Sequence, residues 1–180
     1  MSPSNRGSGL AAVTLVLGGA RSGKSLYAER LIESAAGRGI YCATAEAKDA
    51  EMARRIAAHR ARRGPFWRTI EAPFELPPAI AANALPDAPL LVDCLTLWLS
   101  NLLLAGRAID EEEERLCAGL HCAPGPVVLV ANEVGLGLVP ETPLGRRFRD
   151  AQGALNQRVA ALADRVVFLA AGLPLVLKGG

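Results

Sequence analysis

The sequence lacks a disulfide framework, a long apolar run and a strong net charge. Its four cysteines, Cys42, Cys94, Cys117 and Cys122, follow no spaced disulfide pattern, which favours reduced thiols in a cytoplasmic protein. No segment approaches the roughly 18 consecutive apolar residues of a membrane span, so we expect none. The formal net charge of +2 is too small to indicate nucleic acid as a partner.

Zinc signatures, internal repeats and linkers are also missing. Cys117, His121 and Cys122 lie close together, but their spacing fits no zinc signature and no second ligand pair follows. The chain has 180 residues, of which 51% are hydrophobic and 21% charged, as in a folded protein. We therefore predict one domain over residues 1–180, with residues 1–9 as a flexible tail.

Apolar runs and helical patterns alternate along the chain. Strands are predicted at residues 12–17, 40–44, 67–71, 90–93, 127–131, 166–170 and 173–177. Helices are predicted at residues 25–36, 49–63, around 80–84, 95–104, 110–117 and 142–163. Near-continuous apolar strands are typical of a mostly parallel sheet covered on both faces, and the last two strands form a pair around Ala171-Gly172. The predicted fold is three-layer α/β.

Residues 18–25 read GGARSGKS and match the phosphate-binding pattern G-x-x-x-x-G-K-S/T. The glycines let backbone N–H groups surround phosphate oxygens, and we expect the Lys24 ammonium to meet phosphate and not to be buried in the core. Ser25 offers its hydroxyl to Mg²⁺. A glycine-rich turn with a surface lysine is the alternative, but the motif lies between a buried strand and a helix, as phosphate binding requires. The predicted nucleotide-binding residues here are Gly18, Gly19, Ala20, Arg21, Ser22, Gly23, Lys24 and Ser25.

Asp93 ends the apolar strand LLVD. In P-loop proteins a carboxylate in this place holds Mg²⁺ or its water. The alternative is a cap for the helix that follows Cys94. Because the P-loop is present, the metal-binding role is favoured for Asp93, together with Ser25.

His59 lies near the end of the helix predicted at residues 49–63, beside Arg60, Arg62 and Arg63. Such a cationic cluster would attract a polyphosphate and would lower the pKa of the imidazole, so that the histidine stays a neutral nucleophile. A histidine within a solvated basic helix end is an equally good interpretation of these residues.

Three further groups of polar residues admit a functional interpretation. Glu71 could accept hydrogen bonds from a guanine edge or a ribose, or it could be a solvated strand-end carboxylate. The segment NEVG, residues 132–135, follows a core strand, where open α/β sheets place their ligand sites. For Arg146, Arg147 and Arg149, a solvated helix face is the default interpretation.

Taken together, these motifs resemble the bifunctional adenosylcobinamide kinase / adenosylcobinamide-phosphate guanylyltransferase family of cobalamin biosynthesis. The resemblance covers residues 13–178 and is far more specific than the P-loop alone. It is carried by GGARSGKS at 18–25, DAEMARRI at 49–56 leading to His59, WRTIE at 67–71, LVDCLT at 91–96 with Asn101-Leu102, NEVG at 132–135 with Val139-Pro140, FRD at 148–150 and Asn156-Gln157.

The resemblance implies two reactions. ATP or GTP phosphorylates the aminopropanol hydroxyl of adenosylcobinamide. GTP then reacts with a histidine, which falls on His59, to release pyrophosphate, and the GMP moves onto adenosylcobinamide phosphate. The resemblance also implies guanine or ribose contacts from Thr44, Ala45 and Glu71, and a homotrimer with sites near subunit interfaces.

Two other functions remain as alternatives. In a small-molecule P-loop kinase, His59 would be incidental. In a GTP-dependent regulatory switch, a guanine motif N-K-x-D would be expected, and the sequence contains none. Neither alternative accounts for the whole set of motifs.

Overall fold

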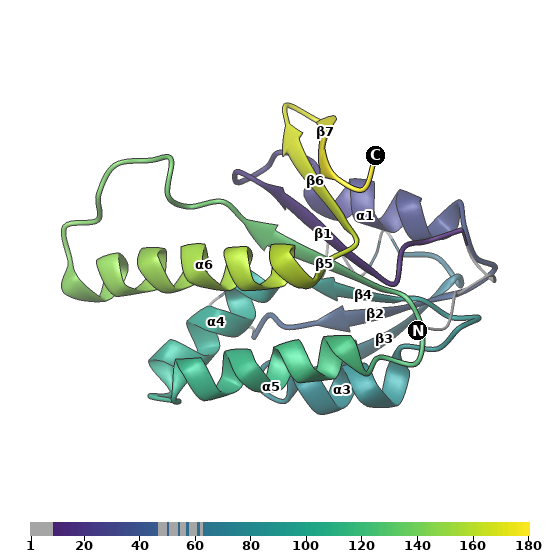
Figure 1. Ribbon diagram of the computed structural model, residues 1–180, viewed down its shortest axis with the longest axis horizontal. Coiled ribbons are helices and arrows are strands. Elements are labelled where there is room, and N and C mark those ends of the chain that lie inside the picture. The colour runs from purple at the N-terminus through teal and green to yellow at the C-terminus, as the bar shows by residue number, and fades with distance from the viewer. Residues whose placement is uncertain (1–8, 47–49, 51–53, 55–56, 58–60, 62) are drawn as a thin grey trace.

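The sheet has the strand order β3-β2-β4-β5-β1-β6-β7 (Figure 1). This computed structural model describes residues 9–46, 50, 54, 57, 61 and 63–180. All neighbouring strands are parallel except β6 and β7, which form an antiparallel pair. The strands are β1 Val13–Gly18, β2 Gly39–Ala43, β3 Trp67–Glu71, β4 Leu90–Asp93, β5 Val127–Asn132, β6 Arg165–Ala170 and β7 Leu173–Lys178.

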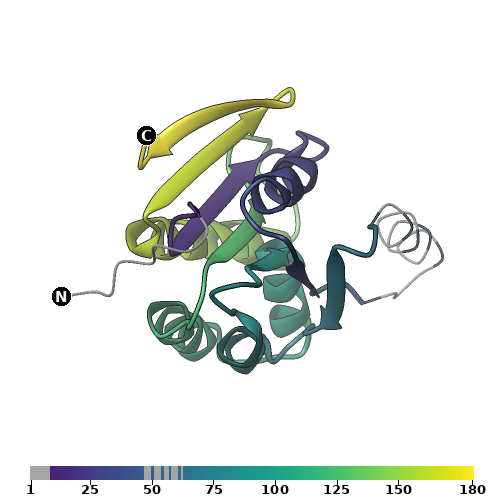
Figure 2. The same cartoon turned by 90° about the vertical axis from the view of Figure 1, so that its right-hand side faces the viewer.

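Helices cover both faces of the sheet, so the predicted three-layer α/β fold with a C-terminal strand pair is confirmed. Helix α1 packs on one face, around a core that includes Ile32 and Val128. Four helices of the described part of the chain pack on the other face, around a core that includes Trp98 and Leu129 (Figures 1 and 2). The helices are α1 Lys24–Glu33, α3 Leu76–Asn83, α4 Leu95–Leu104, α5 Ile109–His121 and α6 Pro143–Leu162.

Three helix boundaries differ from the sequence prediction by more than one residue. Helix α1 ends at Glu33, and Ser34 follows as its C-cap, with an exposed hydroxyl that donates to the carbonyl of Leu31 at 3.0 Å. Helix α3 begins at Leu76, because Pro77 lies in its first turn, where a missing N–H costs nothing. Helix α5 continues to His121, because Leu116 and Leu120 keep its apolar face in the core.

The helix predicted at residues 49–63 falls largely on residues outside the described part of the chain. Its nucleophile candidate His59 and its neighbours Arg60 and Arg62 are among them, whereas Arg63 is described. Of the five described positions within the segment, residues 50, 54, 57 and 61 are helical, whereas Arg63 is not, so the helix does not reach the predicted end at residue 63. Among the helices built from the described residues, none has the combined length and apolarity needed to cross a bilayer.

Parallel pairing brings the carboxyl ends of the central strands to one edge of the sheet. Gly18 at the end of β1 is in register with Asn132 at the end of β5. Asp93 at the end of β4 is in register with Ala43 of β2 and Val130 of β5. Open α/β sheets bind their ligands outside this edge, so the fold places the P-loop and Asp93 where one ligand can reach both.

Thr44 joins the end of β2 to the junction between β4 and α4. Its buried hydroxyl donates to the backbone carbonyl of Cys94 at 2.7 Å. The same hydroxyl oxygen accepts a hydrogen bond from the backbone N–H of Cys94 at 2.8 Å. The Thr44 carbonyl accepts from the side-chain amide of Asn101 at 2.9 Å. Thr44 therefore holds in place the backbone that directly follows Asp93.

Replacing Thr44 by Val should lower the free energy of unfolding by about 1–3 kcal/mol, because valine keeps the volume and leaves the buried N–H of Cys94 without its partner. Urea denaturation of the variant and the parent measures the difference. Ser34→Ala, which removes an exposed hydroxyl, is the matched control and should change stability by less than about 0.5 kcal/mol. Equal stability losses in the two variants would contradict the role assigned to Thr44.

Candidate active site

A cleft of about 520 Å³ opens at the carboxyl edge of the sheet. Residues 20–25 of the P-loop form one wall. The ends of β2, β4 and β5 contribute Ala43, Asp93 and Asn132, and α4 contributes Leu97. The described end of the 49–63 segment contributes Arg63. The cleft therefore gathers residues from five separate parts of the chain around the phosphate-binding loop.

The P-loop packs closely against the C-terminal strand pair β6–β7, and this packing shapes the loop. A side chain at Gly18 would place its Cβ 2.5 Å from the carbonyl oxygen of Leu169 and 2.7 Å from the Ser22 hydroxyl, so only glycine fits. At the hairpin turn, the N–H of Gly172 donates to the carbonyl of Ser22 at 3.0 Å. Gly23 adopts φ +95°, a left-handed conformation suited to glycine, immediately before α1. The β6–β7 turn thus supports the loop from behind.

Lys24 is more buried than the sequence suggests. Only 7% of the residue is exposed, which corrects the expectation of an ammonium outside the interior. The reason is local: Nζ donates to the carbonyl of Gly19 at 2.5 Å and lies 3.5 Å from the Ser22 hydroxyl, so the side chain folds over its own loop. Burial lowers the pKa of Lys24, while the nearby Cys94 and Asp93 oppose this shift. The side chain still lines the cleft.

Asp93 is held by a tyrosine that the sequence analysis missed. The hydroxyl of Tyr41, in β2, donates to Oδ2 of Asp93 at 2.6 Å, and both residues line the cleft. Burial, and then the negative charge of Asp93, raise the pKa of Tyr41, so its hydroxyl stays a proton donor. The available signal was a tyrosine near the end of a buried strand, because a buried tyrosine hydroxyl usually finds a polar partner.

Arg63 lies against the same tyrosine. Its guanidinium carbon is 3.7 Å from the centre of the Tyr41 ring, and its Nη1 donates to the Thr69 hydroxyl at 3.0 Å. Trp67 packs edge-on against the Tyr41 ring, with ring centres 6.0 Å apart. The residue predicted as part of a cationic cluster is therefore fixed at the cleft by a cation–π contact and a hydrogen bond.

Of the three residues predicted to contact guanine or ribose, the structure places only one at the cleft. Ala45 lines the cleft. The Thr44 hydroxyl does not reach it, because it is buried and bonded to Cys94. Glu71 is an exposed residue at the end of the edge strand β3 and is not part of the cleft wall. Nucleotide contacts of Thr44 and Glu71 stay predictions.

The NEVG motif shapes a projecting arm, which we define as residues 133–142. The carboxylate of Glu133 accepts from the N–H groups of Gly135 and Leu136 at 2.8 and 3.1 Å, and the side-chain amide of Asn156 donates to the carbonyl of Asn132 at 3.0 Å. Arg146 donates to the carbonyls of Pro140 and Glu141 at 3.0 and 2.7 Å. These residues fold the arm, and of them only Asn132 lines the cleft.

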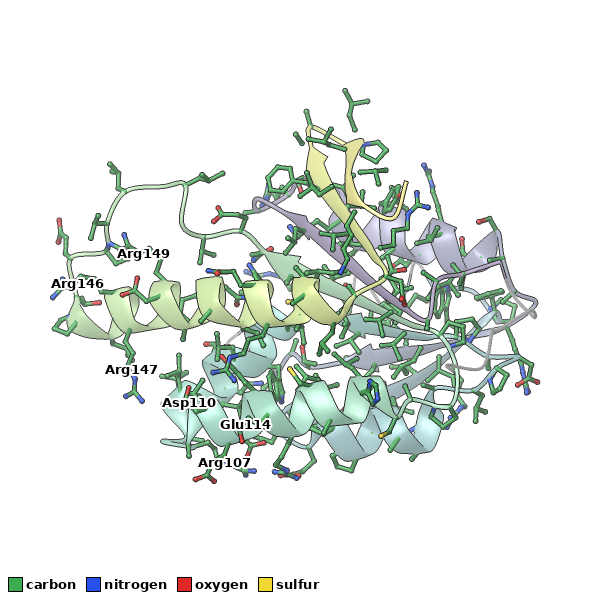
Figure 3. All side chains as sticks on the ribbon, in the orientation of Figure 1. Arg107, Asp110, Glu114, Arg146, Arg147 and Arg149 are labelled. Carbon is green, nitrogen blue, oxygen red and sulfur yellow. The ribbon has the colours of Figure 1, made fainter. Side chains whose placement is uncertain are left out.

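The arginines of helix α6 stand apart from the cleft. Figure 3 shows Arg146 and Arg149 at the outer end of α6, with Arg147 on the side of that helix toward α5. Arg146 and Arg147 are exposed, and Arg149 forms an ion pair with Asp150 at 3.2 Å. These features are those of a solvated helix face. Among the described residues, no group of three histidine, cysteine or carboxylate side chains could hold a metal ion.

Comparison with known proteins identifies the family. Residues 14–177 match the sequence profile of the family described as cobinamide kinase / cobinamide phosphate guanyltransferase. The chain belongs to this family. It is accordingly an enzyme of cobalamin biosynthesis, with a kinase and a guanylyltransferase activity, as the motifs indicate.

Relatives match this cobinamide kinase / cobinamide phosphate guanyltransferase over nearly their whole lengths. The bifunctional adenosylcobalamin biosynthesis protein CobP of Pseudomonas aeruginosa is 52% identical, over 92% of this chain and 96% of that protein. The bifunctional adenosylcobalamin biosynthesis protein CobU of Salmonella typhimurium is 44% identical, over 91% of this chain and 98% of that protein. The CobU protein of Escherichia coli is 40% identical over the same shares.

Solved structures of more distant proteins share the fold. The P4 protein of bacteriophage phi6, in complex with ADP, has a TM-score of 0.50 at 16% identity, over 93% of this chain and 54% of that chain. The flagellar accessory protein FlaH of Methanocaldococcus jannaschii has a TM-score of 0.50 at 11% identity, over 93% of this chain and 78% of that chain. At these identities the likeness shows the P-loop nucleotide-binding fold alone.

Replacing Lys24 by Ala should lower the rates of both nucleotide-dependent reactions by about 100-fold or more, because the variant lacks the ammonium that meets the transferring phosphate. The fold should survive, since burial already disfavours the charged side chain. Steady-state rates with ATP and with GTP, together with a thermal unfolding midpoint, check both parts. Rates near those of the parent in either reaction would show that the two reactions do not share this P-loop.

Proposed function

We propose that the enzyme carries out both reactions in this one cleft. It transfers the γ-phosphate of ATP or GTP to the aminopropanol hydroxyl of adenosylcobinamide. It then transfers GMP from GTP, through a guanylylated His59, to adenosylcobinamide phosphate, which yields adenosylcobinamide-GDP and pyrophosphate. The observation that carries the proposal is the convergence of the P-loop, Asp93 and Arg63 on a single cleft in a member of this family.

The kinase step follows from the P-loop side of the cleft. The N–H groups of the loop bind the phosphate chain at the start of α1, and Lys24 lies beside them to offset negative charge. The acceptor hydroxyl attacks the γ-phosphorus, its new P–O bond forms as the bond to the β-phosphate oxygen breaks, and its proton leaves. Positioning and charge compensation by these groups account for most of the catalysis in such reactions.

The residues that would hold Mg²⁺ are Asp93 and Ser25. Both line the cleft, and both offer the oxygen ligands that Mg²⁺ prefers. Oδ2 of Asp93 accepts the Tyr41 hydroxyl, and within the described residues no hydrogen bond to Oδ1 is seen, so that oxygen is available to a metal or its water. These residues therefore fit a magnesium site. When bound, Mg²⁺ would supply charge neutralisation at the phosphates.

The guanylyl step rests on His59, which lies outside the described residues. Arg63 follows His59 closely in the sequence and lines the cleft, which supports a location of the histidine within reach of a bound nucleotide. A neutral imidazole nitrogen attacks the α-phosphorus of GTP, a P–N bond forms, and the P–O bond to pyrophosphate breaks. The phosphate of the acceptor then displaces the histidine. A covalent relay divides one transfer into two in-line displacements.

We further propose a homotrimer, as the family resemblance implies. Its support is the projecting arm, where Leu136 and Leu138 are 83% and 96% exposed. Figure 1 shows this arm extending from the body of the molecule beside the outer end of α6. Apolar side chains on a projecting segment are commonly covered in an assembly.

Replacing His59 by Asn should abolish the covalent adduct and reduce guanylyl transfer by about 1,000-fold or more, because the nucleophile is removed. With GTP and Mg²⁺ but no corrinoid, the parent should gain one GMP that acid removes and alkali does not, as a phosphoramidate requires. Intact-protein mass spectrometry measures the adduct. The kinase rate should persist at least in part, since that acceptor attacks the phosphate directly.

His121→Asn is the matched control, because His121 is the other histidine of the sequence. It should keep the adduct and both activities. An adduct on the His59 variant, or its loss from the His121 variant, would remove His59 from the mechanism. Product analysis after incubation with GTP, Mg²⁺ and adenosylcobinamide separates the bifunctional enzyme from a simple kinase, which makes only the phosphate, and from a switch, which modifies no corrinoid.

Sedimentation equilibrium should give a mass about three times the 18.9 kDa of the chain. Replacing Leu138 by Asp should shift the assembly toward smaller species, because it places a charge where the arm would be covered. A monomeric parent would refute the trimer. A trimeric Leu138→Asp variant would show that the arm is not part of the interface.

A further inference from the structure

Tyr41 contacts a proposed metal-binding carboxylate, and the proposed steps of the two reactions do not use it. Its hydroxyl donates to Oδ2 of Asp93 at 2.6 Å, across the parallel pair of β2 and β4. Only 3% of the residue is exposed, so little solvent can replace this contact. Hydrogen bonds to a charged acceptor are shorter and stronger than those between neutral groups.

The ring of Tyr41 is fixed by two further contacts. The guanidinium of Arg63 lies over the ring, 3.7 Å from its centre, and Trp67 packs edge-on at 6.0 Å. Trp67 is itself anchored, because its Nε1 donates to the carboxylate of Glu33 at 2.9 Å. The hydroxyl is therefore held in one place, and it determines which oxygen of Asp93 is engaged and which is open to the cleft.

We infer that Tyr41 is a positioning residue that orients Asp93 to bind the divalent cation of the nucleotide complex. It acts on the metal through Asp93 and does not bind the nucleotide. The inference rests on the proposed function in one respect, the metal-binding role of Asp93. It extends that function by naming a residue that the phosphate-binding motif does not contain.

The geometry separates this role from general support of the fold. Replacing Tyr41 by Phe removes the hydroxyl and keeps the ring, so the contacts with Arg63 and Trp67 remain possible. Oδ2 of Asp93 then loses its partner, and the carboxylate is free to rotate. The variant should therefore bind the metal more weakly, whereas phosphate binding by the P-loop should be unaffected.

The test uses the full chain with two probes, Mn²⁺ and a fluorescent N-methylanthraniloyl derivative of GDP. Fluorescence polarisation in EDTA measures the metal-free affinity for the nucleotide, and electron paramagnetic resonance measures Mn²⁺ binding to the GDP complex. Tyr41→Phe should weaken Mn²⁺ binding by about tenfold, the loss expected for one hydrogen bond to a charged group. The metal-free affinity for the nucleotide should stay within about twofold of that of the parent, because Tyr41 makes no hydrogen bond to the nucleotide. Loss of one hydrogen bond to a charged group would lower that affinity by more than about twofold.

Two further variants complete the experiment. Tyr27→Phe removes the hydroxyl of the other tyrosine, which lies in α1 and does not line the cleft, and should leave both affinities unchanged. Asp93→Asn should weaken Mn²⁺ binding at least as much as Tyr41→Phe does. Thermal unfolding midpoints confirm that all three variants are folded.

The possible failures are distinguishable. If Asp93→Asn weakens Mn²⁺ binding and Tyr41→Phe does not, the positioning role is wrong while the proposed metal site stands. If Asp93→Asn leaves Mn²⁺ binding unchanged, the metal role of Asp93 fails and the inference fails with it. If Tyr41→Phe weakens nucleotide binding equally with and without metal, Tyr41 contacts the nucleotide and the inference is overturned.

Discussion

Parallel pairing of β1, β5 and β4 is the constraint on which the rest of the molecule depends. It places Gly18, Asn132 and Asp93 at one edge of the sheet, although they are far apart in the sequence. Backbone N–H groups at the start of α1 then face the same space as a carboxylate from another strand. A phosphate chain and a divalent cation have opposite charges, and this edge offers suitable partners to both.

The functional groups of the cleft are held by hydrogen bonds from residues behind it. The β6–β7 turn supports the P-loop through the bond from Gly172 to Ser22. Thr44 and Asn101 hold the backbone that follows Asp93. Tyr41 orients the carboxylate itself. Preorganisation of this kind matters for phosphate transfer, because the protein contributes mainly position and charge.

The proposed use of one cleft for two reactions has a simple physical rationale. Both reactions require a nucleoside triphosphate with its phosphates held in line, and they differ in which phosphorus is attacked. A shared P-loop meets the common requirement. Guanylyl transfer additionally requires a nucleophile and positive charge near the α-phosphate. The proposed histidine and Arg63 would supply these two. The family to which the chain belongs carries both activities in its description.

The sequence by itself determined the fold class, the P-loop and the family. Each of these depends on patterns that are local in the chain: apolar runs in the central strands, the spacing of the glycines before Lys24, and short motifs in a fixed order. Helix ends were less predictable, as in α5, because the packing of Leu116 and Leu120 in the core carries that helix beyond its predicted end. The local signals for a metal-binding and a helix-capping role of Asp93 are the same, and the sequence favoured the metal-binding role only because the P-loop is present.

Only the tertiary structure decided which side chains face the cleft and which support it. Thr44 and Ala45 both follow the end of β2 and are adjacent, yet the Thr44 hydroxyl is bonded to Cys94 in the interior and Ala45 lines the cleft. Lys24 folds over its own loop because the carbonyl of Gly19 is within reach. Tyr41 and Asp93 are 52 positions apart in the chain, and only the pairing of β2 with β4 brings the hydroxyl to the carboxylate. A hydrogen bond of 2.6 Å between such distant residues has no local signal in the sequence.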